Sequence, residues 1–400
     1  MPVVSSPKNI DLVILAGGKG TRIKALLGVY PKPMLKFNGK HFIQYIINNA
    51  SKYNFKRIII LCGFRHKILF KKFHKKIINL TEVICIREKK LLGTAGALSN
   101  LTRLKVADFV LVNGDTMFDV NIDKLISSLD KKKIGVVALT KNKNQKSKKL
   151  NNLDLEKKLI CIKQNSRLMN GGVYFFKKKI FDYICKQNSS LENDLLPKLI
   201  KQKKINGIFF ENFFIDIGSR HYLKLAGRKL KNQFEKPAVF LDRDGVINYD
   251  YGYVHQIKNF KFRPGVLSGL KYLQNKKYYL FIVTNQAGIG KKKFKESDFF
   301  ELHEEINNKL KKFNIFINDI QYSPFHPKAK IKKYKKNSLM RKPGNKMINN
   351  IMSNWDLKYR KSFMIGDKVT DKLAAKKSKI KFFYAEKNFY KQIKSIINNY

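Results

Sequence analysis

The sequence has no run of about 18 apolar residues, so it predicts no membrane-spanning helix. The first apolar run, residues 12–16, is too short for a secretory signal, and no basic stretch precedes it. Cysteine is scarce: the four cysteines all lie in the first half and include no Cys-x-x-Cys pair. This usage is typical of free thiols in a reducing compartment, so we expect a cytoplasmic protein.

Acidic residues are also few, 29 against 83 lysines and arginines, which gives a formal net charge of +54. One interpretation is nucleic-acid binding. The other is biased codon use, because lysine far outnumbers arginine, Asn and Ile are abundant, and the lysines do not form one stripe. We favour codon bias and keep a basic nucleic-acid-binding protein on an inactive enzyme scaffold as the alternative. A basic surface would also attract phosphorylated substrates.

Two successions of apolar strands and helices follow each other along the chain, and they predict an α/β fold with a parallel, doubly covered sheet in each half. A lysine-rich helix ends near residue 232, and Pro237 precedes a new strand. We therefore predict a tail at 1–9, a first domain at 10–232, a linker at 233–236 and a second domain at 237–400. The polar residues 141–158 are expected to form a surface excursion. The expected strands are 12–15, 58–61, 109–112, 134–139 and 173–176, then 238–241, 279–283 and 363–365.

Asp242 and Asp244 come directly after the apolar strand 238–241, at the strand end where ligands bind in open α/β sheets. Two carboxylates one residue apart can divide the work of a phosphatase. One attacks phosphorus, and the other protonates the leaving oxygen and later activates water. An Asp-x-Asp-Gly stretch alone is also typical of a turn or a calcium loop, so the assignment depends on residues further along the chain.

Three further pieces lie in the second half. Thr284 ends a strand and offers a hydroxyl to a phosphoryl oxygen, with Asn285 beside it. Lys342, within Arg341-Lys342-Pro343, can neutralise the charge of the phosphoryl group. Asp367 comes after the strand 363–365 and would complete an oxygen site suited to Mg²⁺.

These pieces, in this order, resemble the haloacid dehalogenase-like superfamily, which implies a parallel sheet. The resemblance implies that Asp242 is the nucleophile and Asp244 the acid/base. The sequence around 242–248 and 284–290 is similar to the branch of heptose 1,7-bisphosphate phosphatases and histidinol-phosphatases. The other implied roles are phosphate binding for Thr284 and Lys342, substrate contact for Asn285 and Arg341, Mg²⁺ binding for Asp242, Asp244 and Asp367, and a supporting acid at Asp371.

Many members of that branch carry a zinc-stabilised loop before the Arg-Lys-Pro. Ser323, Phe325, Ser338 and Met340 stand where its cysteine and histidine ligands would be, and His326 alone cannot supply four ligands. We therefore predict no zinc, and the basic loop 328–336 must be held in another way or be mobile.

In the first half, the strand 12–15 leads into Gly17-Gly18-Lys19-Gly20-Thr21-Arg22, where glycines let backbone amides approach a triphosphate. A glycine-rich loop alone is equally typical of a turn. The continuation adds Lys32 and a small-residue loop at Gly93 that suits a flat base. Asp115 and Asp216 come after apolar stretches, and two such aspartates can hold the metal ion of a nucleotidyl transfer.

This set resembles the sugar-1-phosphate nucleotidyltransferases over about residues 10–231, which implies a GT-A-like mixed sheet. The local sequence looks closest to heptose 1-phosphate guanylyltransferases, which favours GTP. Members usually carry Phe-x-Glu-Lys before the Asn-Gly-Gly that contains Gly172, a residue on the substrate side. Here the glutamate is missing and Lys163 is a stand-in for the lysine. The implied roles are nucleotide binding and transfer for Lys19, Arg22 and Lys32, base contact for Gly93, and Mg²⁺ binding for Asp115 and Asp216.

The favoured function is a bifunctional, Mg²⁺-dependent enzyme of sugar-nucleotide synthesis with two Rossmann-like domains. The second domain would remove the C7 phosphate of D-glycero-D-manno-heptose 1,7-bisphosphate, and the first would couple the 1-phosphate to GTP. A nucleotidyltransferase for UTP, CTP or dTTP stays the enzymatic alternative. Sugar phosphates and a nucleoside triphosphate are the expected partners, while the anomer and the oligomeric state stay open.

Overall fold

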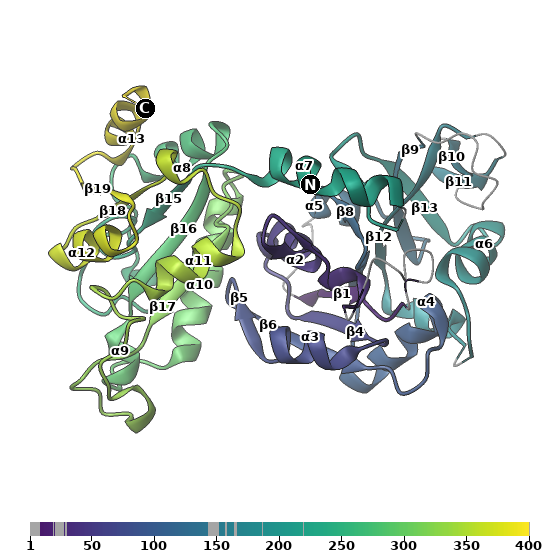
Figure 1. Ribbon diagram of the computed structural model, residues 1–400, viewed down its shortest axis with the longest axis horizontal. Coiled ribbons are helices and arrows are strands. Elements are labelled where there is room, and N and C mark those ends of the chain that lie inside the picture. The colour runs from purple at the N-terminus through teal and green to yellow at the C-terminus, as the bar shows by residue number, and fades with distance from the viewer. Residues whose placement is uncertain are drawn as a thin grey trace. The chain divides into compact units, whose positions relative to one another are not determined.

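The computed structural model describes residues 9–18, 20, 28, 30–142, 152–156, 158–163, 166–185, 187–218 and 220–399. The chain divides into two compact units, Met1–Leu230 and Lys231–Tyr400. Helix α7 (Arg220–Phe234) runs across this division. Each unit is an α/β structure with its own sheet, as Figure 1 shows.

The first unit contains a large mixed sheet, in which ten described strands have the order β10-β11-β13-β9-β12-β7-β1-β4-β6-β5. Strand β1 pairs in parallel with β4 and β7, but β12 runs antiparallel to both β7 and β9. The prediction of a purely parallel sheet from strand and helix alternation was therefore wrong for this half, and the mixed sheet is confirmed. The strands are β1 (Asp11–Leu15), β4 (Ile58–Cys62), β5 (Lys76–Ile78), β6 (Thr81–Arg87), β7 (Phe109–Asn113), β9 (Gly135–Lys141), β10 (Asn152–Glu156), β11 (Leu159–Ile162), β12 (Leu168–Phe176) and β13 (Ile205–Phe209).

Part of the predicted surface excursion belongs to this sheet, because β10 pairs with β11 and β12. Residues 143–151 and 157 of that segment lie outside the described residues. A small antiparallel sheet joins β8 (Thr116–Phe118) to β14 (Phe214–Asp216), and another joins β2 (Lys36–Phe37) to β3 (Lys40–His41). The helical elements among the described residues of this unit are η3 (Lys32–Met34), α2 (Phe42–Ser51), α3 (His66–Phe73), α4 (Gly93–Gly96), η4 (Ala97–Leu104), α5 (Ile122–Ser127), η5 (Lys178–Tyr183), η6 (Leu191–Leu195), α6 (Leu196–Lys201) and α7.

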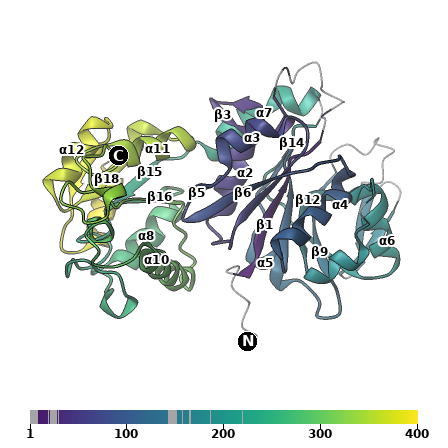
Figure 2. The same cartoon turned by 90° about the horizontal axis from the view of Figure 1, so that it is seen from below.

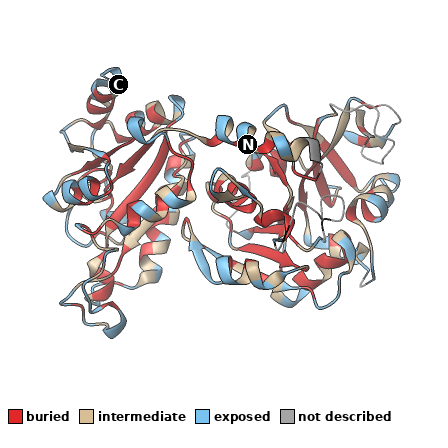
Figure 3. Cartoon of the chain, in the orientation of Figure 1, coloured by how far each residue is buried: buried red, intermediate tan, exposed pale blue. Residues whose placement is uncertain are grey.

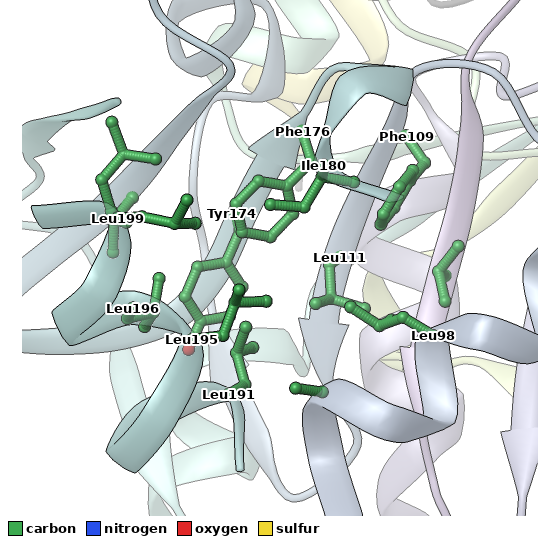
Figure 4. Packing of buried hydrophobic residues seen from close by; sticks show 14 of the residues in the cluster. Leu98, Phe109, Leu111, Tyr174, Phe176, Ile180, Leu191, Leu195, Leu196 and Leu199 are labelled. Atoms are coloured by element: carbon green, nitrogen blue, oxygen red, sulfur yellow. The ribbon is translucent and has the colours of Figure 1, made fainter. Parts of the chain in front are cut away.

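The core of the first unit lies between the sheet and the helices that cover it. Tyr174 and Phe176 of β12 face leucines of η6 and α6, with Phe109 and Leu111 of β7 beside them (Figure 4). The central strands read as continuous apolar runs because both of their faces are covered, and Figure 3 shows them buried.

The second unit is built on a parallel five-stranded sheet with the order β17-β16-β15-β18-β19, and all five strands are labelled in Figure 1. Figure 2 shows β18, β15 and β16 of this sheet from another side. Parallel pairing throughout confirms the sheet expected for this half. The strands are β15 (Ala238–Leu241), β16 (Tyr279–Asn285), β17 (Asp319–Ser323), β18 (Phe363–Gly366) and β19 (Lys381–Tyr384). The helices are η7 (Ile257–Asn259), α8 (Val266–Asn275), α9 (Ala287–Gly290), α10 (Glu296–Lys311), η8 (Lys332–Tyr334), α11 (Lys346–Asn354), η9 (Tyr359–Lys361), α12 (Val369–Lys377) and α13 (Phe389–Asn398).

Packing in the core of the second unit fixes the position of the strand ends, and these ends carry the polar residues of the candidate site. Phe240 and Phe281 of adjacent strands contact each other, and Trp355 contacts Phe281 from one face. Trp355 is therefore a packing residue of this core. Within the described part of the chain, no helix combines the length and apolarity needed to cross a bilayer.

Candidate active sites

The carboxyl end of β15 carries Asp242, a buried residue at the centre of the second unit. Its backbone N–H donates to the Ile365 carbonyl at 3.0 Å, which joins it to β18. Lys342 Nζ lies 3.0 Å from Asp242 Oδ1 and 2.6 Å from Asp371 Oδ1. The same ammonium donates to the Val283 carbonyl at 2.8 Å. Three elements therefore fix one buried lysine against two aspartates.

Burial and charge act in opposite directions on this group. Burial raises the pKa of Asp242, Lys342 lowers it, and Asp371 and Asp244 raise it again, with a net rise. Burial lowers the pKa of Lys342, but Asp242 and Asp371 outweigh it and the net change is upward. Lys342 therefore stays protonated, and its single positive charge does not balance the negative charge that the surrounding carboxylates would carry together.

A third carboxylate completes this group. Asp242, Asp367 and Asp371 each offer an oxygen within 4.8 Å of the others, so they could hold a metal ion. Asp367 Oδ1 is buried and has no hydrogen-bond partner among the described residues. Burial raises the pKa of Asp367, which Lys368 partly opposes. At Gly245 the φ angle is +84°, and a Cβ would overlap the Asp367 carboxylate, so only glycine fits there.

Asp244 points to a different set of partners. Arg243 Nη2 donates to both of its oxygens at 2.9 Å. Gln286 Nε2 donates to Oδ2 at 3.0 Å, and Asn248 Nδ2 donates to Oδ1 at 2.9 Å. The structure thus places the Asp244 carboxylate among amides and a buried guanidinium, and the carboxylate group suited to a metal contains Asp371 and not Asp244.

The phosphate-binding candidates lie around the same strand ends. Thr284 is buried at the end of β16, and its Oγ1 accepts from Gln286 Nε2 at 2.9 Å. Asn285 exchanges two hydrogen bonds with the backbone of Lys342, at 2.9 and 3.1 Å. Arg341 is half-buried, and its Nη1 has no hydrogen-bond partner among the described residues. Burial lowers the pKa of Arg341. The structure therefore brings together all seven residues predicted for this site, with the supporting acid Asp371.

The first unit contains a cavity of about 730 Å³ above the carboxyl ends of β1 and β7. Gly17, Gly18 and Gly20 line it, as do Gly93 and Gly172. Of the predicted loop, Lys19, Thr21 and Arg22 lie outside the described residues. Lys163 is exposed and does not line the described cavity.

Lys32 lies with the two aspartates at one end of this cavity. Its Nζ donates to Asp115 Oδ2 at 2.5 Å. A Cβ at Gly218 would lie 2.8 Å from Asp216 Oδ1 and 3.2 Å from Lys32 Nζ, so the second carboxylate and the ammonium flank the same glycine. The backbone N–H of Ile217, which follows β14, donates to the carbonyl of Asp115, which precedes β8, at 3.0 Å. This bond holds the ends of β8 and β14 together. The predicted pair of aspartates is thus assembled, with a lysine beside it.

Glu88 is a buried carboxylate in the cavity wall that sequence reasoning missed. It lies against the backbone of Gly17, because a Cβ there would overlap its Oε1. Burial raises the pKa of Glu88 to about 7, against a lowering by the backbone of Leu92. No described lysine or arginine forms an ion pair with it, so the Leu92 backbone is the stabilising contact that opposes the effect of burial. The position of Glu88 in the sequence offered a signal, because this residue directly follows the strand β6.

Other residues of the two sites are harder to recognise from the sequence. Arg243 stands between the two aspartates, but a sequence does not show that an arginine will be buried. Gln286 lies two residues after Thr284, and its link to Asp244 depends on tertiary structure. Glu192 lies in the first turn of η6 and lines the cavity of the first unit.

Comparison with known proteins separates the same two regions. Residues 12–233 match the Nucleotidyl transferase family, and residues 241–395 match the family described as Polynucleotide kinase 3 phosphatase. A D-glycero-beta-D-manno-heptose-1,7-bisphosphate 7-phosphatase from Photorhabdus laumondii is 42% identical over 144 residues, which are 36% of this chain and 77% of that protein. A D-glycero-alpha-D-manno-heptose 1-phosphate guanylyltransferase from Campylobacter jejuni is 30% identical over 213 residues, 52% of this chain and 95% of that protein. The crystal structure of HddC from Yersinia pseudotuberculosis covers 56% of this chain and 100% of that one, with 30% identity and a TM-score of 0.46.

The fold, the sites and these relatives define a two-domain enzyme, a nucleotidyltransferase joined to a phosphatase. The chain belongs to the Nucleotidyl transferase family in its first half and to the family of the D-glycero-beta-D-manno-heptose-1,7-bisphosphate 7-phosphatases in its second.

Proposed function

We propose that the chain performs two consecutive steps of sugar-nucleotide synthesis, with residues 10–232 and 237–400 as the two catalytic domains. The second domain removes the C7 phosphate of a heptose 1,7-bisphosphate, and the first transfers GMP from GTP to the resulting 1-phosphate. The Asp242–Lys342–Asp371 group carries the phosphatase proposal, because it holds a buried carboxylate beside a fixed cation. Both substrates and the four free cysteines suit the cytoplasm.

In the phosphatase domain, Asp242 attacks phosphorus, and the bond between phosphorus and the sugar oxygen breaks. Asp244 gives a proton to the leaving oxygen, then takes one from the water that hydrolyses the aspartyl phosphate. Lys342 and Thr284 bind the phosphoryl oxygens, while Asn285 and Arg341 contact the rest of the substrate. Gln286 supports this division of work because it binds both Asp244 and Thr284.

The residues of both sites fit Mg²⁺. Asp242, Asp367 and Asp371 supply the hard oxygen ligands that this ion prefers, and the orphaned Asp367 Oδ1 needs a partner. Asp115 and Asp216 form the corresponding pair in the first domain. When bound, Mg²⁺ would neutralise charge on the transferring phosphoryl or nucleotidyl group. The geometry favours the Asp371 carboxylate over that of Asp244 as the third acidic ligand.

The residues that stand at the zinc-ligand positions on either side of the basic loop do not fit zinc. Ser323 and Ser338 offer hydroxyls, and Met340 Sδ accepts from Asn350 Nδ2 at 3.6 Å. Glu296 holds the loop instead, since it accepts from Tyr322 Oη at 2.7 Å and from Tyr334 Oη at 2.9 Å. We keep the assignment of no zinc as part of the proposal.

Glu88 supports GTP as the nucleotide. Among the common bases, only guanine presents two adjacent donors, N1–H and the N2 amino group, to a single carboxylate. A carboxylate accepts but cannot donate, so uracil, thymine, cytosine and adenine each leave an acceptor facing it. Gly17 and Gly93 let the nucleotide lie close to the same wall.

The names of the two relatives differ in anomer, beta for the phosphatase and alpha for the guanylyltransferase. Consecutive steps on one chain need one anomer, because dephosphorylation at C7 leaves C1 unchanged. We propose the alpha anomer. The C1 phosphate is the reacting group of the transferase, whereas it lies far from the reacting phosphate of the phosphatase, so the transferase is the stricter site.

The test is to incubate the full chain with each anomer of the bisphosphate, Mg²⁺ and GTP, and to identify the products by mass. We expect GDP-heptose from the alpha anomer. Asp242→Asn should abolish phosphate release from the bisphosphate but keep pyrophosphate release from heptose 1-phosphate and GTP. Asp298→Asn, a change outside the site that keeps an acceptor at the start of α10, is the control. Phosphate release by Asp242→Asn would refute the nucleophile.

A further inference from the structure

Four carboxylates line the described cavity of the first domain. Asp115 and Asp216 lie with Lys32 at the end proposed for the metal ion. Glu88 lies against Gly17, at the position proposed for the base. Glu192 is therefore the carboxylate of this cavity that the proposed transfer reaction leaves without a role.

Glu192 is surrounded by uncharged donors. Thr94 Oγ1 donates to its Oε2 at 3.2 Å, and Asn113 Nδ2 donates to its Oε1 at 3.3 Å. Ser190 Oγ donates to Oε2 at 3.5 Å. These bonds lie at or beyond the long end of the usual range, so they are weak. A carboxylate offers about four lone-pair sites, which leaves room for a further donor and for exchange of the long bonds.

The wall around Glu192 is polar but neutral. Asn170 is fixed in it, because its Nδ2 donates to Tyr174 Oη at 2.6 Å and its Oδ1 accepts from the Gly172 N–H at 2.9 Å. Amides and hydroxyls around one carboxylate match a polyhydroxylated ligand, since sugar hydroxyls both donate and accept. The neutral polar wall consists of Thr94, Asn113, Asn170, Asn188, Ser190 and Asn193.

We infer that Glu192 accepts hydrogen bonds from hydroxyl groups of the sugar 1-phosphate and is a specificity-determining residue of the transfer reaction. This inference rests on the proposed nucleotidyl transfer. A sugar that lacks the contacted hydroxyl is rejected, because it leaves the carboxylate desolvated and without a donor.

A purely structural role is the competing explanation. Glu192 connects Thr94, in the loop proposed for the base, to Asn113, in the strand that leads to Asp115. The backbone N–H of Leu191 also donates to Thr94 Oγ1 at 2.7 Å. If Glu192 only held these elements together, its loss would disturb nucleotide binding as much as sugar binding. The two explanations therefore differ in which KM changes.

The experiment measures pyrophosphate release by Glu192→Gln in the full chain. Loss of a hydrogen bond to a charged group costs about 1.5–3 kcal/mol, so the KM for heptose 1-phosphate should rise roughly 10- to 150-fold. The KM for GTP should stay within about twofold, because the inference assigns Glu192 to the sugar and not to the nucleotide. Glu192→Asp, which keeps the charge, should recover part of the loss. Glu82→Gln, the same chemical change at an exposed position of β6, should match the wild type.

Monodeoxy sugar 1-phosphates identify the contact. Removal of the contacted hydroxyl should impair the wild type but cost Glu192→Gln nothing further, since the partner is already lost. An unchanged sugar KM in Glu192→Gln, or a parallel rise in the KM for GTP, overturns the inference while the transfer function stands. If the wild type itself releases no pyrophosphate from heptose 1-phosphate and GTP, the transfer function fails and the inference fails with it.

Discussion

The variant Glu88→Gln most directly tests the proposal that Glu88 recognises the guanine base. The wild-type carboxylate can accept from both N1–H and the N2 amino group of guanine. Glutamine keeps one acceptor but turns an amino group toward a guanine donor, so one charged hydrogen bond is lost. Such a bond contributes about 1.5–3 kcal/mol, and the mismatch removes part of what remains. We expect kcat/KM for GTP to fall roughly 30- to 150-fold, which corresponds to about 2–3 kcal/mol.

The pH dependence gives the same prediction an independent measure. Because burial raises the pKa of Glu88 to about 7, the free enzyme carries a neutral Glu88 below that pH and a carboxylate above it. Only the carboxylate accepts from both guanine donors. The KM for GTP should therefore rise as pH falls, by about tenfold between pH 8 and pH 6 for a single group that titrates near 7.

Glu88→Gln should lose this pH dependence, because glutamine does not titrate in the range. The assay is pyrophosphate release at saturating heptose 1-phosphate, with GTP, UTP, CTP and dTTP in turn. The same four nucleotides also decide between GTP and the other bases left open by the sequence. An unchanged GTP preference in Glu88→Gln, or a pH profile identical to the wild type, would refute the reading of guanine by this residue.

Two predictions concern the phosphatase domain. Lys342→Met leaves Asp242 and Asp371 buried without their shared cation. The free energy of unfolding, measured in urea with EDTA present, should therefore fall by about 3–5 kcal/mol, and phosphate release should be abolished. A variant as stable as the wild type would refute the role of this ion pair. A zinc-selective chelator should leave the unfolding midpoint and the phosphatase activity unchanged. Glu296→Gln should lower the midpoint, because it weakens the hydrogen bonds from Tyr322 and Tyr334. A midpoint that falls when the chelator is added would contradict the prediction that the loop holds no zinc.

The phosphatase site was largely predictable because its residues lie at strand ends. Parallel strands place their carboxyl ends at one edge, so Asp242, Thr284 and Asp367 had to come close once β15, β16 and β18 were recognised. What a sequence does not show is the direction of side chains. Asp244 was expected beside the metal, but the structure turns its carboxylate to Arg243, whose burial depends on how α10 and the loop before Val254 enclose it.

The first domain was less predictable because chain direction is not encoded in apolar runs. Strand β12 reads like its parallel neighbours, yet it runs antiparallel between β7 and β9, and this reversal makes the sheet mixed. Glu88 was missed, and Glu192 was given no role in the site, for a related reason. A glutamate after a strand or in a short helical turn is usually solvated, and only the tertiary structure shows that these two line a cavity.

The two sites balance their carboxylates differently, and this difference bears on how each would accept a cation. In the phosphatase site, Lys342 pairs with Asp242 and Asp371, while Asp367 Oδ1 lies buried without a described partner. A cation can therefore bind there without displacing the lysine. In the transferase site, Lys32 holds Asp115 Oδ2 at 2.5 Å and flanks Gly218 together with Asp216. A cation that binds both aspartates must compete with Lys32 and leave its ammonium available to the phosphates of the nucleotide. Metal and nucleotide binding should accordingly be coupled in the first domain.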